Sequence, residues 1–197
     1  MKTMLKSALA LAVLIGLAAP AAAQTVKLNP RAGIYVPLTD LGDAGSTFGT
    51  IAADRSGTLA YGLGVEIDFP VFPLDVRANL DYATGSEITL EGTGGTTDRE
   101  LMMLSADVMF RPLPSLIIVK PYFFAGAGVR KYDFDAASLE DASDPMFHGG
   151  GGLELLLGPL TVNGEVGDYI SSYEDPTGTS QTQHDVFVTI GLVLGLL

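Results

Sequence analysis

The sequence predicts an all-β protein, an eight-stranded antiparallel transmembrane up-and-down β-barrel with short periplasmic turns and long extracellular loops. Three observations predict it. About eight segments alternate apolar and polar residues, one face of nearly every segment is apolar along its full length, and the connections are alternately short and long. A soluble barrel buries its apolar face. Strands whose other face carries glycine and charged residues suit a barrel with hydrocarbon outside and polar side chains within.

The N-terminal segment predicts export and is not expected to belong to the fold. Lys2 and Lys6 give a positive start, residues 5–19 form a short, largely apolar stretch, and Pro20 and three alanines follow. This pattern predicts a cleaved signal peptide at residues 1–23 and a barrel domain at residues 24–197. An uncleaved membrane helix is the alternative, but the stretch is shorter than the roughly 20 residues that a span needs. The chain has no cysteine, which excludes a disulfide and a lipid anchor on cysteine.

The charge balance limits the classes of partner. The whole chain has a net charge of −12, and its 23 acidic residues all follow the signal segment, which contains only basic charges. Such acidity argues against nucleic-acid binding, which requires a positive surface. The hydrophobic content of 47% argues against disorder. The mature chain has no run of about 18 apolar residues, which argues against a helical membrane protein.

The first four strand segments separate into an apolar and a polar face when every second residue is taken together. Residues 26–36 read VKLNPRAGIYV, and residues 58–69 read TLAYGLGVEIDF. Residues 74–82 read LDVRANLDY, in which aspartate, arginine and asparagine alternate with leucine, valine and alanine. Residues 102–110 read MMLSADVMF and show the least regular pattern, because methionine stands on both faces.

The last four segments repeat the alternation. Residues 120–130 read KPYFFAGAGVR, and residues 147–157 read FHGGGGLELLL. Residues 160–167 read LTVNGEVG, and residues 185–196 read DVFVTIGLVLGL. Most of the eight segments have about the 9 to 11 residues of a tilted transmembrane strand.

The connections give an independent indication of topology. Short turns are predicted at residues 70–73, 111–115 and 158–159. Long polar loops are predicted at residues 39–57, 83–99, 133–145 and 171–184. Strict alternation puts the long loops at one end of the barrel and both termini at the other, which is the layout of outer-membrane barrels.

Charged residues on the polar faces are the candidate site. The interior of an eight-stranded barrel is only wide enough to be filled by side chains, so its charges must be paired. The sequence therefore predicts a structural network of salt bridges that plugs the lumen. A gated ion path, in which Arg31 or Arg77 exchanges carboxylate partners, is the alternative. The predicted network consists of Arg31, Glu66, Arg77, Asp81, Asp107, Lys120, Arg130, Glu154 and Glu165.

Catalytic chemistry has little support in the sequence. The glycine pairs do not form G-x-G-x-x-G between a strand and a helix, which argues against nucleotide binding. The nearest approach to a hydrolase set is Asp168, Ser171, Ser172 and His184 around the fourth long loop, for which ordinary polar loop residues are the simpler interpretation. We therefore expect a protein that is not an enzyme, with no catalytic residue, cofactor or metal.

Two stretches and the C-terminal strand resemble the small eight-stranded outer-membrane barrels, the class of the OmpA transmembrane domain, OmpX and the opacity proteins. The stretches are PYFFAGAGVRKY at residues 121–132 and GGGGLELLLGPLTVNGEVGDY at residues 149–169. The C-terminal residues that fit this family's assembly signal are Thr189, Gly191, Leu194 and Leu196. The chain departs from the family in ending with Leu197, where such chains usually end in phenylalanine or tryptophan.

The resemblance implies a location and partners. We expect a monomer in the cell outer membrane, in contact with outer-membrane lipids and lipopolysaccharide and inserted by the barrel-assembly machinery. The expected role is structural or surface-interaction, with four loops displayed towards an unknown extracellular partner. The alternatives are a narrow ion or solute channel, an enzyme that modifies outer-membrane lipid, and a soluble, lipocalin-like periplasmic barrel that binds a small ligand.

Overall fold

Nine strands account for most of the residues that the structure describes. The computed structural model describes residues 25–39, 51–53, 57–69, 73–90, 95–112, 118–134, 142–158, 160–174 and 180–196. The strands are β1 (Thr25–Pro37), β2 (Ile51–Ala53), β3 (Thr58–Asp68), β4 (Leu74–Leu90), β5 (Gly95–Phe110), β6 (Val119–Phe134), β7 (Ala142–Leu157), β8 (Leu160–Glu174) and β9 (Ser180–Gly195).

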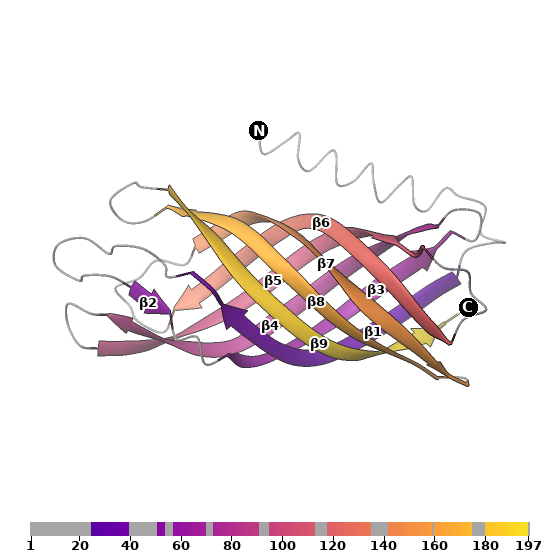
Figure 1. Cartoon of the computed structure of the whole chain (residues 1–197). Helices are drawn as coiled ribbons and strands as arrows, with labels where there is room; N and C mark the ends of the chain where they lie inside the picture. Colours follow the sequence, from indigo (N-terminus) through magenta and orange to yellow (C-terminus); the bar gives the residue numbers. More distant parts are fainter. Residues whose placement is uncertain are drawn as a thin grey trace.

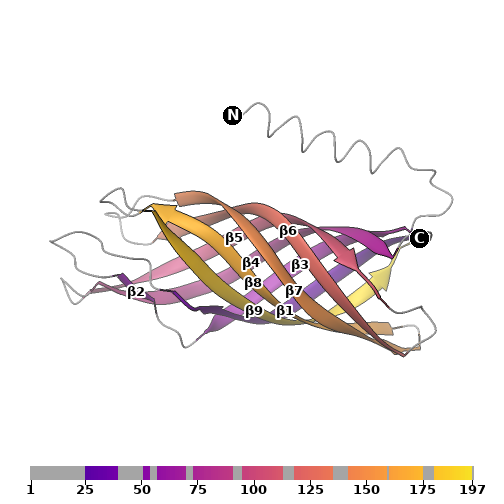
Figure 2. The same ribbon diagram turned by 45° about the horizontal axis from the view of Figure 1, so that its top comes forward.

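Eight of these strands close into an antiparallel barrel. Within this set of β1 and β3 to β9, each strand pairs with two others, and the pairing of β1 with β9 closes the sheet. Lys27 lies opposite Gly195, so β1 begins beside the end of β9, at the end of the barrel where the short connections lie. Figures 1 and 2 show the strands strongly tilted in the barrel wall. In the described part of the chain, no helix is both long enough and apolar enough to cross a membrane.

The burial of the side chains is inverted relative to a soluble barrel. Outward-facing Phe147 and Ile190 are 68% and 63% exposed, whereas Arg77 and Arg130 are 1% and 0% exposed. The same alternation of exposed apolar and buried polar residues runs along β3 and β5. The predicted assignment of faces is therefore confirmed, and so is the eight-stranded antiparallel barrel.

The strands extend further towards the long-loop end than the sequence predicts. β4 continues to Leu90 and β5 begins at Gly95, so most of the predicted loop 83–99 is paired strand. The hairpins β6–β7 and β8–β9 extend into the predicted loops 133–145 and 171–184 in the same way. Those loop boundaries were wrong. Apolar alternation marks a strand only where one face is buried or meets hydrocarbon, while backbone pairing can continue beyond that region.

A short ninth strand was not predicted. β2 lies within the first predicted loop and pairs with the end of β4, where Ile51 is opposite Leu90. The register between β4 and β5 shifts between Ala83 and Ser86, which marks a β-bulge or irregularity where β4 enters its extension. The predicted signal peptide 1–23 lies outside the described residues, as do most of the first loop and Leu197.

Hydrogen exchange distinguishes the observed strand extension from the predicted loop. We expect the amides of residues 86–90 and 95–99 to be protected in the folded protein, in the alternating pattern of a paired hairpin, because these residues face one another in register. The amides of residues 74–80 in the same strand are the internal reference. Free exchange throughout residues 86–99 would show that the segment is a loop.

Candidate functional site

Arg77 lies at the centre of the network of ion pairs in the lumen. Its Nε and Nη2 donate to Asp107 Oδ2 at 3.0 and 2.7 Å, and its Nη1 donates to Glu165 Oε2 at 2.6 Å. These three side chains come from β4, β5 and β8, and none is more than 5% exposed. Tyr122 of β6 adds a hydroxyl that donates to Glu165 at 2.9 Å. One buried guanidinium therefore joins strands on opposite walls of the barrel through charge-assisted hydrogen bonds.

Arg31 forms a second ionic centre beside the first. Its Nε donates to Asp81 Oδ1 at 2.9 Å and its Nη2 to Asp81 Oδ2 at 2.6 Å, which is the bidentate geometry that suits a guanidinium and a carboxylate. Its Nη1 donates to Asn79 Oδ1 at 2.9 Å. Asn79 in turn donates to Asp107 at 2.8 Å and so connects the two centres.

His148 extends this network towards the loop end. Its Nε2 lies in hydrogen-bond contact with Asp107, and both side chains are 0% exposed. Its ring stacks on Tyr169 of the neighbouring strand β8, with centroids 4.7 Å apart and planes inclined by 9°. Asp107 thereby accepts hydrogen bonds from both Arg77 and Asn79 and is joined to His148, which makes it the most connected carboxylate described in the lumen.

A third cluster lies at the short-turn end. Arg111 Nη2 lies 2.7 Å from both Glu66 and Glu154, and Arg111 also pairs with Asp75. Lys27 pairs with Glu66 at 3.3 Å.

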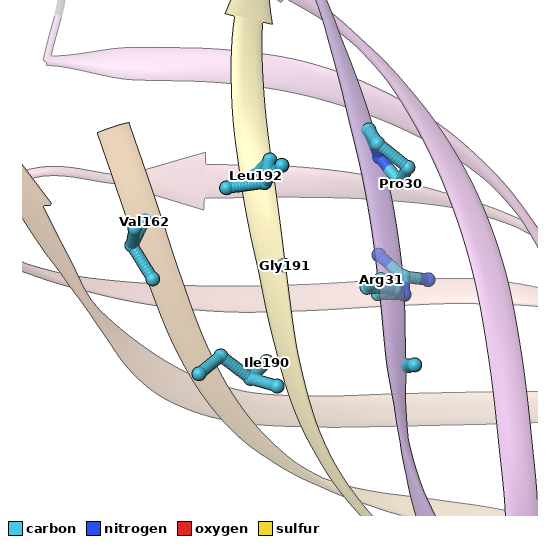
Figure 3. Close-up of a pocket in the computed structure, with 7 residues that line it drawn as sticks. Pro30, Arg31, Val162, Ile190, Gly191 and Leu192 are labelled. Atoms are coloured by element: carbon cyan, nitrogen blue, oxygen red, sulfur yellow. The ribbon is translucent and has the colours of Figure 1, made fainter. Parts of the chain in front are cut away.

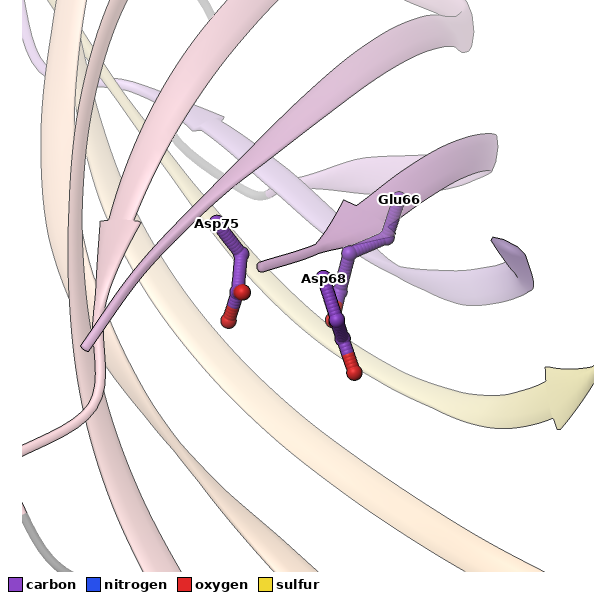
Figure 4. A group of neighbouring side chains, drawn as sticks. All are labelled: Glu66, Asp68 and Asp75. Carbon is purple, nitrogen blue, oxygen red and sulfur yellow. The ribbon is translucent and has the colours of Figure 1, made fainter. Parts of the chain in front are cut away.

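Carboxylates in this third cluster could suggest a cation site. Figure 4 shows Glu66, Asp68 and Asp75 at the adjoining ends of β3 and β4, and their oxygens lie within 4.8 Å of one another. Arg111 and Lys27 are bonded to these same carboxylates, and Lys27 also pairs with Asp68. We therefore assign the group to the ion-pair network.

The loop end of the lumen contains one more ionic group and an apolar layer. Arg130 pairs with Asp185 and lies 3.4 Å from Gln183. An apolar cluster occupies the same half of the lumen, with Tyr35 and Phe187 in contact across the β1–β9 junction at 4.9 Å between centroids. The members of this cluster are Tyr35, Ala60, Ala83, Leu101, Met103, Met146, Tyr169 and Phe187. The lumen is thus occupied by apolar side chains as well as by ion pairs.

The four cations of the predicted network differ in whether a carboxylate pairs with them. Arg31, Arg77 and Arg130 have carboxylate partners. Lys120 lies opposite Glu154 in register and is half-buried, but no carboxylate of the described residues pairs with it, and Glu154 pairs with Arg111 instead.

The predicted network omitted several charged partners in these clusters, namely Lys27, Asp68, Asp75, Arg111 and Asp185. Arg111 had been placed in a turn, although continuing the alternation one residue beyond Phe110 turns it inward. Asp75 and Asp185 lie on the polar faces of their predicted segments, so the same alternation places both in the lumen.

The four residues considered as a hydrolase set are divided between the two faces of the barrel wall. His184 Nδ1 lies 3.2 Å from Asp168 Oδ2 on the outer face, where their side chains are 41% and 45% exposed. Ser171 is 5% exposed and faces the lumen, whereas the neighbouring Ser172 is exposed. The structure therefore brings the acid and the histidine together but puts Ser171 on the opposite face.

The residues of the predicted assembly signal lie in β9, except for Leu196, which directly follows it. Leu194 and Leu196 face outward and are 39% and 52% exposed, and Gly191 is buried beside β1. Thr189 is half-buried opposite Gly33. Their role in assembly stays a prediction.

Comparison with known proteins identifies the class of fold. No protein-family model matches the chain, and no curated protein matches it in sequence. Neisserial surface protein A matches with a TM-score of 0.58 and 10% identity over 88% of this chain and 97% of its own. A major outer membrane protein from Thermus thermophilus matches with a TM-score of 0.56 and 15% identity, over 88% of this chain and 100% of its own. The chain therefore has the fold of the small eight-stranded outer-membrane barrels.

Removing the central guanidinium tests the importance of the network. We expect Arg77→Met to lower the free energy of unfolding by about 3–5 kcal/mol, because Asp107 and Glu165 would lose their shared buried cation. Urea unfolding of the barrel in lipid vesicles measures this loss. Lys120→Met is the matched control, with an expected change within about 1 kcal/mol. Equal losses in the two variants would contradict a special role for Arg77.

Substitution of Gly62 tests whether the lumen needs the space that this glycine leaves beside Arg31. A Cβ at this position would lie 2.8 Å from Arg31 Nε and against Asp81 Oδ1. We expect Gly62→Ala to destabilise the barrel by about 1–3 kcal/mol, since the bidentate pair would have to move. Gly164→Ala is the control, because its Cβ meets nothing nearer than Thr189 O at 3.9 Å. The same unfolding assay would refute the argument if the two alanines had the same effect.

Proposed function

We propose that this chain spans the outer membrane as a monomeric barrel and has a structural or surface-interaction role. The observation that carries the proposal is the combination of an apolar outer face with a lumen filled by paired charges and apolar side chains. In water, the exposed row from Val188 to Leu196 would be an extended apolar patch, which argues against a soluble ligand-binding barrel.

The height of the apolar belt suits a bilayer. On β9 the outward row is apolar from Val186 to Leu196 and is preceded by His184. With a rise of about 3.3 Å per residue and a tilt of about 45°, this row spans about 23 Å along the membrane normal. Glu100 stands in the equivalent outward position above the apolar residues of β5. These polar residues support a membrane boundary at the loop end.

A filled lumen favours a structural role over a channel. The ionic centres of Arg31 and Arg77 occupy its middle, and the apolar cluster around Tyr35 and Phe187 occupies its loop half. Passage of an ion would require several buried pairs to separate in low dielectric, which is costly. The separation of Ser171 from His184 likewise gives no support to a lipid-modifying enzyme.

The loop end supports surface interaction. The hairpins continue as paired strands beyond the belt, so the segments they present to the cell exterior start from a rigid base. One structural neighbour is by its name a surface protein. We further propose that residues 1–23 are removed on export, that the barrel-assembly machinery inserts the chain, and that outer-membrane lipids and lipopolysaccharide surround it.

Heat-dependent gel mobility, combined with conductance, tests this function. We expect the protein from the outer-membrane fraction to run at different positions before and after boiling, because a hydrogen-bonded barrel resists detergent in the cold. In planar bilayers we expect no discrete current steps. A protein found in the soluble periplasmic fraction without a mobility shift would refute the membrane barrel. Regular current steps that change in Glu66→Gln would instead establish the channel.

A further inference from the structure

An apolar groove lies on the outer face of the barrel, across the junction of its first and last strands. It has a volume of about 440 Å³ and is formed by β1, β8 and β9 (Figure 3). The residues around it are Pro30, Ala32, Val162, Ile190, Gly191 and Leu192, with Arg31 at its border. Ile190 and Leu192 belong to the outward apolar row and are 63% and 41% exposed. The groove therefore opens within the apolar belt.

The backbone ladder is interrupted beneath this groove. Leu28 pairs with Leu194 and Arg31 pairs with Gly191, but the two rungs between them are missing. Leu196 N donates to Val26 O, and Leu38 N donates to His184 O. These two bonds show that the even-numbered residues of β1 are the ones that bond to β9.

Proline explains the interruption and identifies an unused acceptor. Pro30 stands at one of these bonding positions, opposite Leu192, and proline has no N–H to donate. The carbonyl of Leu192 consequently receives no hydrogen bond from β1. At hydrocarbon depth, water is not available to replace it, so the missing donor is costly.

Arg31 cannot supply the missing donor. Its guanidinium is buried in the lumen, where Asp81 and Asn79 accept its hydrogen bonds at 2.6 to 2.9 Å. The groove thus combines apolar walls with a backbone acceptor, the carbonyl of Leu192, that receives no hydrogen bond from β1. Small-molecule sites have this composition, with apolar walls and a few polar groups that fix the ligand's orientation.

We propose that the groove binds an elongated apolar molecule with one hydroxyl group, a long-chain alcohol in chemical terms. Its chain lies along Ala32, Ile190 and Val162, and its hydroxyl donates to the carbonyl of Leu192. The inference rests on the proposed function, because the groove faces hydrocarbon only if the barrel spans a membrane. The proposed ligand site lies on the outer face at the β1–β9 junction and is separate from the ion pairs inside the lumen.

Titration of the folded protein in lipid nanodiscs tests the site, with 1-dodecanol as the probe and dodecyl methyl ether as the analogue that cannot donate. We expect saturable shifts of the amide NMR signals of Ala32, Ile190, Gly191 and Leu192. Binding of the alcohol should be about two- to tenfold tighter than binding of the ether, as expected for one hydrogen bond. Linear shifts spread over the whole belt would show general partitioning into lipid and overturn the proposal.

Two variants test the apolar walls of the groove and its hydrogen-bond acceptor separately. Ala32→Phe fills the groove and should abolish saturable binding, whereas Ala106→Phe, at an exposed outward position of β5, should leave it intact. Pro30→Ala restores an N–H that can donate to the carbonyl of Leu192. In this variant we expect the alcohol and the ether to bind with about equal affinity. An undiminished preference in Pro30→Ala, or binding by Ala32→Phe equal to that of Ala106→Phe, would overturn the proposal. A barrel that enters nanodiscs without local shifts refutes this site alone, whereas failure to enter them refutes the proposed function as well.

Discussion

The structure depends on the pairing of Arg77 with Asp107 and Glu165. An eight-stranded barrel has no room for bulk water at its centre, so a charge placed there needs a partner in the protein. Arg77 meets two carboxylates, one on the adjacent strand β5 and one on β8 across the lumen. The bond to Glu165 joins β4 to β8, which share no backbone pairing, so it ties opposite walls of the barrel together as well as balancing the charge inside it.

Glycine is the second requirement of such a lumen. The long side chains of Arg31 and Arg77 occupy space that any Cβ on the facing strand would take. At Gly126, a Cβ would lie 2.6 Å from Asp107 Oδ1 and 2.8 Å from His148 Cε1. At Gly64, it would lie 3.2 Å from the Cδ of Arg77. Glycines on β3 and β6 therefore leave room for long or bonded polar side chains of the neighbouring strands.

The sequence was sufficient to predict which face of each strand points into the lumen. It was not sufficient to predict which side chains pair across the lumen. Alternation identified which residues point inward, and extending it one step would have included Arg111. The pairing of Arg77 with Asp107 follows from the register of β4 and β5, which a hairpin argument could have supplied. The pairing with Glu165 depends on strand tilt and on the stagger accumulated around the barrel, which no local pattern encodes. The ends of β4 and β5 were missed because strands beyond the belt need no apolar alternation.

Barrel closure is coupled to the filling of the lumen. No ion pair among the described residues joins β1 to β9, and their ladder is interrupted at Pro30. Each strand is instead tied across the lumen, β1 through Arg31 to Asp81 of β4 and β9 through Asp185 to Arg130 of β6. The junction can therefore lack a backbone hydrogen bond while both strands remain in place. This explains how a proline is tolerated within a closed sheet, where a flanking strand would ordinarily require its N–H.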